Sequence, residues 1–177
     1  EGVIDGVLDV TTTEWADELV GGVLSAGPTR LDAAAETGTP QVVSTGALDM
    51  VNFGPREEVP EEFEGRNLHV HNPQVTLMRT TPDECAELGR IIGEKLNAAT
   101  GPTTLALPLR GVSMLAVEGE DFYDPEADAA LFDALRETVD DDVDLLELDT
   151  DVNDEAFAEA IAERLHEHLR EAGRAPE

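Results

Sequence analysis

Polar residues and glycines follow four of the segments that the sequence predicts to be β-strands. These segments are residues 3–10, 41–44, 68–71 and 103–109, which are rich in apolar and β-branched side chains. In an open parallel sheet, ligands bind beyond the carboxyl ends of the strands. We therefore expect a ligand-binding or active site at this edge, formed by Gly22, Ser25, Gly27, Asp49, Asn52, His71, Asn72, Arg79, Arg110 and Ser113.

Asp49 and His71 are the residues of this set that could transfer protons. A histidine side chain titrates near neutrality, so His71 suits the role of a general base. With Asp49 and either Ser44 or Ser113, it could also form a hydrolytic triad. Residues 111–115 lack the second glycine of the GxSxG turn that presents such a serine, so we favour Ser113 as a loop or capping residue.

His69 and His71 are two residues apart, so a β-strand would place both imidazoles on one face. Together with Asp49 they could bind zinc or iron. The spacing does not identify a third ligand. The simpler interpretation is therefore one histidine packed in the core and one in solvent, and we predict no metal site.

Arg110 follows a predicted strand and precedes a glycine in a chain that has few cations. A planar guanidinium in that position suits a clamp for a carboxylate or a phosphate. The alternative is an ordinary ion pair with one of the many acidic residues. Arg79 has the same two interpretations.

The glycine-rich segment 21–27 could bring backbone N–H groups close to an anion. It lacks the order of a GxGxxG motif and the lysine of a phosphate-binding P-loop. A helix C-cap followed by a tight turn explains the same glycines equally well.

The composition excludes several classes of protein. The 177 residues include 40 Asp and Glu against 11 Lys and Arg, which gives a formal net charge of −29. A nucleic-acid-binding protein needs a basic face, so we expect no nucleic-acid partner. No apolar run approaches the roughly 20 residues of a membrane span, and a single cysteine, Cys85, excludes an internal disulfide.

Lysine is almost absent, since Lys95 is the only one, and the acids are spread along the whole chain. At 1 M salt the screening length falls to about 3 Å, so a dense carboxylate surface is tolerated there. We therefore expect a cytoplasmic protein from a halophile. The alternative is an acidic surface for a specific partner.

Predicted strands alternate with predicted helices along the chain, which indicates an α/β fold. Thr81-Pro82-Asp83-Glu84 is a strong helix start, and Asp124-Pro125 and residues 153–154 begin two more helices. We expect a Rossmann-like three-layer sandwich with a mostly parallel sheet of about five strands. Residues 46–67 are expected to form a long irregular segment.

Five ordered strings resemble the uncharacterised protein family of the tomato mosaic virus resistance protein, whose members are often labelled Tm-one-like ATP-binding domain proteins. The strings are GVLDVTTTEWADELVGGVLSAGP, STGALDMVNFGP, HNPQVTLMRTTPDE, LPLRGVS and FYDPEADAALFDAL. The resemblance covers nearly the whole chain and corresponds to the C-terminal half of the family's conserved region. All ten candidate site residues lie within these strings.

The resemblance implies Rossmann-like architecture in both halves of a longer protein. Residues 1–177 would then form a single α/β domain whose partner is the N-terminal half. ATP is implied as a ligand by the family label, with most nucleotide contacts in that absent half. The resemblance assigns no catalytic roles and no reaction.

Three functions follow as hypotheses. The first is a small-molecule enzyme or binding domain for an anionic or nucleotide-related ligand, with Asp49 and His71 transferring protons and Arg110 holding the anion. The second is a non-catalytic ligand-binding or dimerisation module whose contact buries residues 46–67. The third is a metal-dependent hydrolase that uses His69 or His71.

Overall fold

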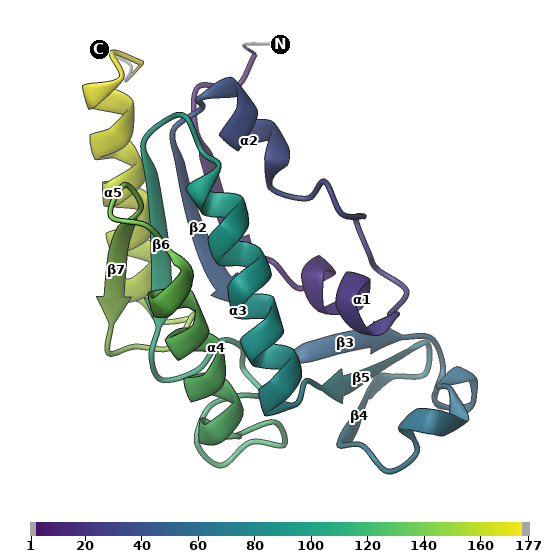
Figure 1. Ribbon diagram of the computed structural model, residues 1–177. Helices are drawn as coiled ribbons and strands as arrows, with labels where there is room; N and C mark the ends of the chain where they lie inside the picture. The colour runs from purple at the N-terminus through teal and green to yellow at the C-terminus, as the bar shows by residue number, and fades with distance from the viewer. Residues whose placement is uncertain (1–2, 175–177) are drawn as a thin grey trace.

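A computed structural model describes residues 3–174 of the chain, and its centre is a parallel β-sheet (Figure 1). The strands are β1 (Val7–Thr11), β2 (Gln41–Gly46), β6 (Thr103–Pro108) and β7 (Asp144–Leu148), and they lie in the order β1-β2-β6-β7. All neighbouring pairs run parallel. The predicted α/β class is confirmed, with four strands in this sheet rather than about five.

Helices cover both faces of the sheet, as a Rossmann-like three-layer arrangement requires. Figure 1 shows α1 (Glu14–Val20), α2 (Asp32–Thr37), α3 (Pro82–Asn97) and α4 (Pro125–Thr138) on one side and α5 (Glu155–Glu171) on the other. Between residues 3 and 174, no helix is long and apolar enough to cross a membrane.

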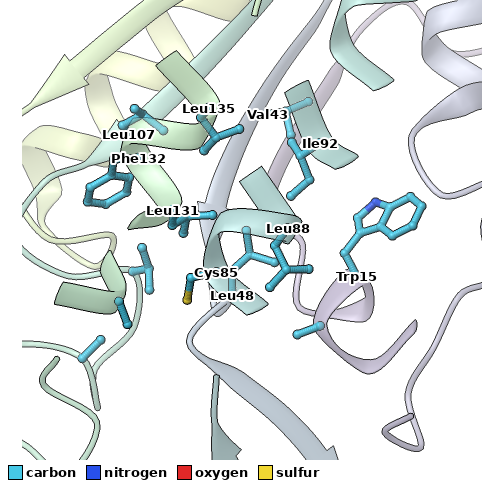
Figure 2. Packing of buried hydrophobic residues seen from close by; sticks show 14 of the residues in the cluster. Trp15, Val43, Leu48, Cys85, Leu88, Ile92, Leu107, Leu131, Phe132 and Leu135 are labelled. Atoms are coloured by element: carbon cyan, nitrogen blue, oxygen red, sulfur yellow. The ribbon is translucent and has the colours of Figure 1, made fainter. Parts of the chain in front are cut away.

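Successive side chains of the central strands point to opposite faces and enter two separate cores. Val43, Leu105 and Leu107 belong to the larger core, which lies under α3 and α4. Figure 2 shows Val43 and Leu107 beside the helix residues Leu88, Ile92, Leu131 and Leu135. Val42 and Ala106 instead pack against Phe157 and Ile161 of α5.

The predicted start of α3 is confirmed in detail. The Thr81 hydroxyl accepts a hydrogen bond from the Glu84 amide at 3.2 Å, and the Glu84 carboxylate accepts one from the Thr81 amide at 2.8 Å. This reciprocal capping box satisfies two amides that have no partner within the helix. Asp124 and Asp154 cap α4 and α5 in the same regions that the sequence indicated.

Residues 46–67 were expected to be irregular, and this expectation is wrong for part of the segment. It contains β3 (Met50–Phe53) and two short 3-10 turns, Arg56–Glu58 and Glu61–Phe63. Strand β3 pairs antiparallel with β5 (Val75–Arg79), which pairs with β4 (Leu68–Asn72), so the three form a second sheet in the order β3-β5-β4. A four-residue strand whose partner lies more than twenty residues away leaves little local signal in the sequence.

Gly46 ends β2 where the backbones of β1 and β2 come very close. A Cβ atom at this position would lie 2.3 Å from the Val10 carbonyl oxygen, and the β1–β2 register is irregular between Asp9 and Thr11. The Thr12 amide then donates to the Gly46 carbonyl at 3.0 Å. This close approach fixes where the chain turns away from the sheet toward β3.

We predict that Gly46→Ala lowers the free energy of unfolding by about 1–3 kcal/mol, because backbone atoms cannot move aside as a flexible side chain can. Gly65→Ala is the matched control, since nothing lies within 4 Å of a Cβ there. Denaturant unfolding monitored by circular dichroism measures both. Equal stability of the two variants would contradict the close packing of β1 and β2.

Candidate functional site

Arg79, the last residue of β5, is buried where the second sheet meets the segment before α4. Its Nε donates to the Phe122 carbonyl at 2.9 Å, and its Nη2 donates to the Asp124 carbonyl at 3.3 Å and to Asp128 Oδ1 at 2.5 Å. The Arg79 side chain is 4% exposed. Its charge is therefore directed toward the protein's own carbonyl and carboxylate groups.

The remaining Arg79 nitrogen, Nη1, contacts the beginning of α3. It donates to Thr80 Oγ1 at 3.0 Å and lies 3.8 Å from Cys85 Sγ. Thr80 Oγ1 donates in turn to the Leu48 carbonyl at 3.0 Å. Burial raises the pKa of the Cys85 thiol to about 11, so this cysteine is a neutral core residue.

Asp49 and Ser113 form a buried pair near the carboxyl end of β2. Ser113 Oγ donates to Asp49 Oδ2 at 2.6 Å and accepts hydrogen bonds from the Leu115 and Ala116 amides at 3.0 and 3.2 Å. Burial raises the pKa of Asp49, while the Ser113 hydrogen bond and the nearby Arg79 charge oppose that rise. Ser113 is thus a capping residue that joins two loops, as the sequence favoured.

The two histidines of β4 lie apart from this pair. His69 Nδ1 is 2.7 Å from Asp121 Oδ2, and its ring packs edge-on against Phe122 at 6.1 Å between centroids. His71 is exposed, and no hydrogen bond within residues 3–174 joins it to Asp49. Among residues 3–174, no group of three His, Cys, Asp or Glu side chains is arranged so that it could hold a metal ion.

Asn52 and Gly22 meet at a buried carboxylate of α1. Asp17 Oδ1 accepts from the Asn52 amide at 2.8 Å, and Oδ2 accepts from Asn52 Nδ2 at 2.7 Å. Burial raises the pKa of Asp17 against the effect of these hydrogen bonds. A Cβ atom on Gly22 would lie 1.5 Å from Asp17 Oδ1. These three residues attach α1 to β3.

Ser25, Gly27 and Asn72 shape turns at the surface. Ser25 Oγ donates to Glu18 and accepts from the Gly27 amide at 2.9 Å, and Gly27 has a positive φ of 81°. Asn72 Oδ1 accepts from the Gln74 amide at 2.8 Å in the β4–β5 turn. For segment 21–27, the structure therefore shows a helix C-cap at Gly21 followed by a turn.

A groove of about 840 Å³ lies between α4 and the segments that follow β6 and β7, and we call it the α4 groove. Helix α4 supplies one wall with Asp128, Phe132 and Arg136, and the other wall includes Leu109 and Arg110. Tyr123, Pro125, Ala129, Val117, Glu118 and Asp151 complete the lining. The groove lies beyond the carboxyl ends of β6 and β7, and Arg110 is the one residue of the ten predicted site residues that lines it. Strand β4, which the sequence analysis counted among the strands of the parallel sheet, belongs to the second sheet and does not contribute to this edge.

The two arginines of the groove each contact acidic residues at the end of β7. Arg110 Nε and Nη2 donate to the two Asp149 carboxylate oxygens at 2.6 and 2.8 Å. This pairing lowers the pKa of Asp149. Arg136 Nε donates to Glu147 at 2.7 Å, and its Nη1 donates to Asp133 at 2.7 Å. Both arginine side chains remain more than one-third exposed.

Of the ten predicted residues, the structure brings Asp49, Arg79 and Ser113 into one buried cluster and places Arg110 on the groove. The other six lie outside both the buried cluster and the groove lining: Gly22, Ser25, Gly27, Asn52, His71 and Asn72. Sequence reasoning missed Asp128 and Arg136, although Asp128 stands in the FYDPEADAALFDAL string. An acidic residue in the first turn of α4 is unremarkable by itself, and only its long-range contact with Arg79 sets it apart.

A model of a protein family, described as the uncharacterised protein family (UPF0261) C-terminal domain, matches residues 1–169 of the chain. The chain belongs to the UPF0261 family. It is 61% identical to a UPF0261 protein of Clostridium tetani, over 93% of the chain and 41% of that relative. It is 55% identical to a UPF0261 protein of Rhizobium meliloti, over 90% of the chain and 40% of the relative.

The tomato relatives of this UPF0261 domain agree with the resemblance drawn from the five strings. The chain is 46% identical to the ToMV resistance protein Tm-1(GCR237) of Solanum lycopersicum, over 92% of the chain and 22% of that protein. It is 44% identical to the ToMV susceptible protein tm-1(GCR26), over 97% and 23%. The chain thus spans about two-fifths of these bacterial relatives and under a quarter of the tomato proteins. Similarity to both a resistance and a susceptible protein transfers no antiviral role.

We predict that Arg79→Met lowers the free energy of unfolding by about 3–5 kcal/mol, because the Phe122 carbonyl, the Asp124 carbonyl and the Asp128 carboxyl group all lose their shared hydrogen-bond donor. It should also expose Cys85, so a thiol reagent at pH 8 should modify the variant faster than the native protein. Arg90→Met is the control: Arg90 forms an exposed pair with Glu87 on α3, and its loss should cost less than about 0.5 kcal/mol. Equal effects of the two variants would show that Arg79 has no special structural role.

Proposed function

We propose that this UPF0261 domain binds a small anionic molecule in the α4 groove. The observation that carries the proposal is the pair of exposed guanidinium groups, Arg110 and Arg136, that line one groove in a chain of net charge −29. The groove volume of about 840 Å³ lies in the range of small-molecule sites. Its place beyond β6 and β7 is where ligands bind in parallel sheets.

The acidic partners of the two arginines do not prevent such binding. Asp149 is 75% exposed in its pair with Arg110, and Glu147 is 37% exposed in its pair with Arg136. Surface ion pairs of this kind contribute only about 0–1 kcal/mol, so a carboxylate or phosphate of a ligand can displace them at small cost. A guanidinium holds such groups through two parallel N–H donors.

A nucleotide-related ligand and an enzymatic reaction remain extensions of this proposal. The chain spans about two-fifths of the length of its bacterial relatives. This supports the proposal that an N-terminal half is the partner of this domain and adds further contacts to the ligand. Proton transfer by Asp49 and His71 stays a prediction. Asp49 is buried beside Ser113 and His71 is exposed on β4, so we assign the binding of the anion to the groove instead.

We also propose that the surface is adapted to high salt. The scarcity of lysine supports this proposal, because the single lysine of the chain is used to join two segments and does not serve as a free surface cation. Lys95 Nζ donates to Asp32 at 2.6 Å and to the Pro28 carbonyl at 2.6 Å. It also lies 5.3 Å from the centre of the Trp15 ring. The abundant surface carboxylates have too few cations to pair with and repel one another at low ionic strength.

We expect Arg110→Gln and Arg136→Gln each to weaken the binding of sulfate, orthophosphate or citrate about tenfold or more, because each removes a charge-assisted hydrogen bond. Arg90→Gln, which removes an exposed arginine away from the groove, is the control and should bind as the native chain does. Isothermal titration calorimetry gives the dissociation constants. If none of the three anions binds the native chain, or if all three variants bind alike, the α4 groove is not the anion site.

We expect the midpoint of thermal unfolding to rise when KCl is increased from 0.1 to 2 M, because screening removes repulsion among the surface carboxylates. An uncharged osmolyte at equal osmolality controls for effects that do not depend on charge. A midpoint that stays constant or falls with KCl argues against salt adaptation.

A further inference from the structure

The carboxyl group of Asp128, which lines the α4 groove, has one oxygen held by Arg79 and one that has no hydrogen-bond partner among residues 3–174. Oδ1 accepts the 2.5 Å hydrogen bond from Arg79 Nη2. Oδ2 takes part in no hydrogen bond with any residue from 3 to 174, and it is not among the fully buried atoms that lack a partner. The side chain is 13% exposed and lines the groove. Oδ2 is therefore accessible to a ligand there.

Arg79 cannot serve the ligand itself, because its donors are already used. Its nitrogens bind Phe122, Thr80, Asp124 and Asp128, and only 4% of its side chain is exposed. It holds Oδ1 in place, so that only Oδ2 is free to exchange a proton. Arg79 is thus a positioning residue for Asp128.

Charged and titratable groups face Asp128 from both sides. On the protein side are Arg79, Asp49, Asp124 and Cys85, and on the groove side are Arg110, Arg136, Glu118 and Asp151. Loss of hydration outweighs the attraction of Arg79 and raises the pKa of Asp128 to about 6, with Asp49 and Asp124 adding to the rise. A carboxyl group in this range changes its protonation state at the cost of little free energy near neutral pH.

We propose that Asp128 takes up a proton when an oxyanion binds in the α4 groove and then donates a hydrogen bond from Oδ2 to an oxygen of that ligand. This inference rests on the proposed function. The ligand class it names is a carboxylate, phosphate or sulfate group that accepts hydrogen bonds from Arg110, Arg136 and a neutral carboxylic acid together. The proton comes from solvent, and it returns there when the ligand leaves.

A neutral Asp128 also explains how an anion can bind between acidic walls. An ionised carboxylate at Oδ2 would repel the ligand at close range, whereas a carboxylic acid supplies a donor. Binding therefore selects the protonated form, and the affinity must fall as the pH rises through the pKa of the free protein.

Sulfate tests this proposal because it stays a dianion between pH 6 and 8, so any proton that is taken up binds to the protein. Calorimetric titrations at pH 7 in two buffers of different ionisation enthalpy measure that uptake. The native chain should take up close to one proton per sulfate, and its Kd should rise about 50-fold from pH 6 to pH 8, as a pKa of about 6 requires.

Two variants separate this role from general electrostatics. Asp128→Asn should bind sulfate without proton uptake and with a Kd that is almost independent of pH. Glu126→Gln removes the same charge from the same turn of α4 outside the groove lining, and it should retain both the uptake and the pH dependence. Sulfate binding to the native chain without uptake, or uptake that persists in Asp128→Asn, overturns the role of Asp128 and leaves the anion site intact. Absence of sulfate binding overturns both.

Discussion

Arg79 joins four separate parts of the chain through one buried guanidinium. From the end of β5 it contacts the start of α3 at Thr80 and Cys85, the carbonyl of Phe122, and the first turn of α4 at Asp128. A buried charge is stable only if every donor finds an acceptor, so these segments cannot move independently. The second sheet, α3 and the wall of the α4 groove therefore hold one another in place.

The same constraint connects the protein interior with its surface. Arg79 fixes one oxygen of Asp128, burial raises the pKa of that carboxyl, and the residue lines the groove with its other oxygen free of partners among residues 3–174. Arg110 and Arg136 lie around the same groove with surface carboxylates as their partners. Two exposed cations and a carboxyl group with a raised pKa therefore line the same groove, and on this arrangement we base the proposal of an anion site in a strongly acidic chain.

The sequence predicted features that depend on neighbouring residues. The alternation of strands and helices indicated the parallel sheet, and the Thr81–Glu84 spacing located the beginning of α3. It could not show β3, whose partner β5 is distant in the chain. It marked Arg79 and Arg110 as exceptional cations, but the partners of Arg79 are up to 49 residues away. Asp128 was missed for the same reason, since its environment is produced by the fold.

An NMR titration of the 15N-labelled chain with sulfate at pH 6 tests most directly the proposal that the α4 groove binds oxyanions. We expect the amide shifts to change mainly at residues 109–111, 117–118 and 123–136, which line or flank the groove. Changes centred on residues 22–27 or on His71 and Asn72, with residues 109–136 unaffected, would contradict this account.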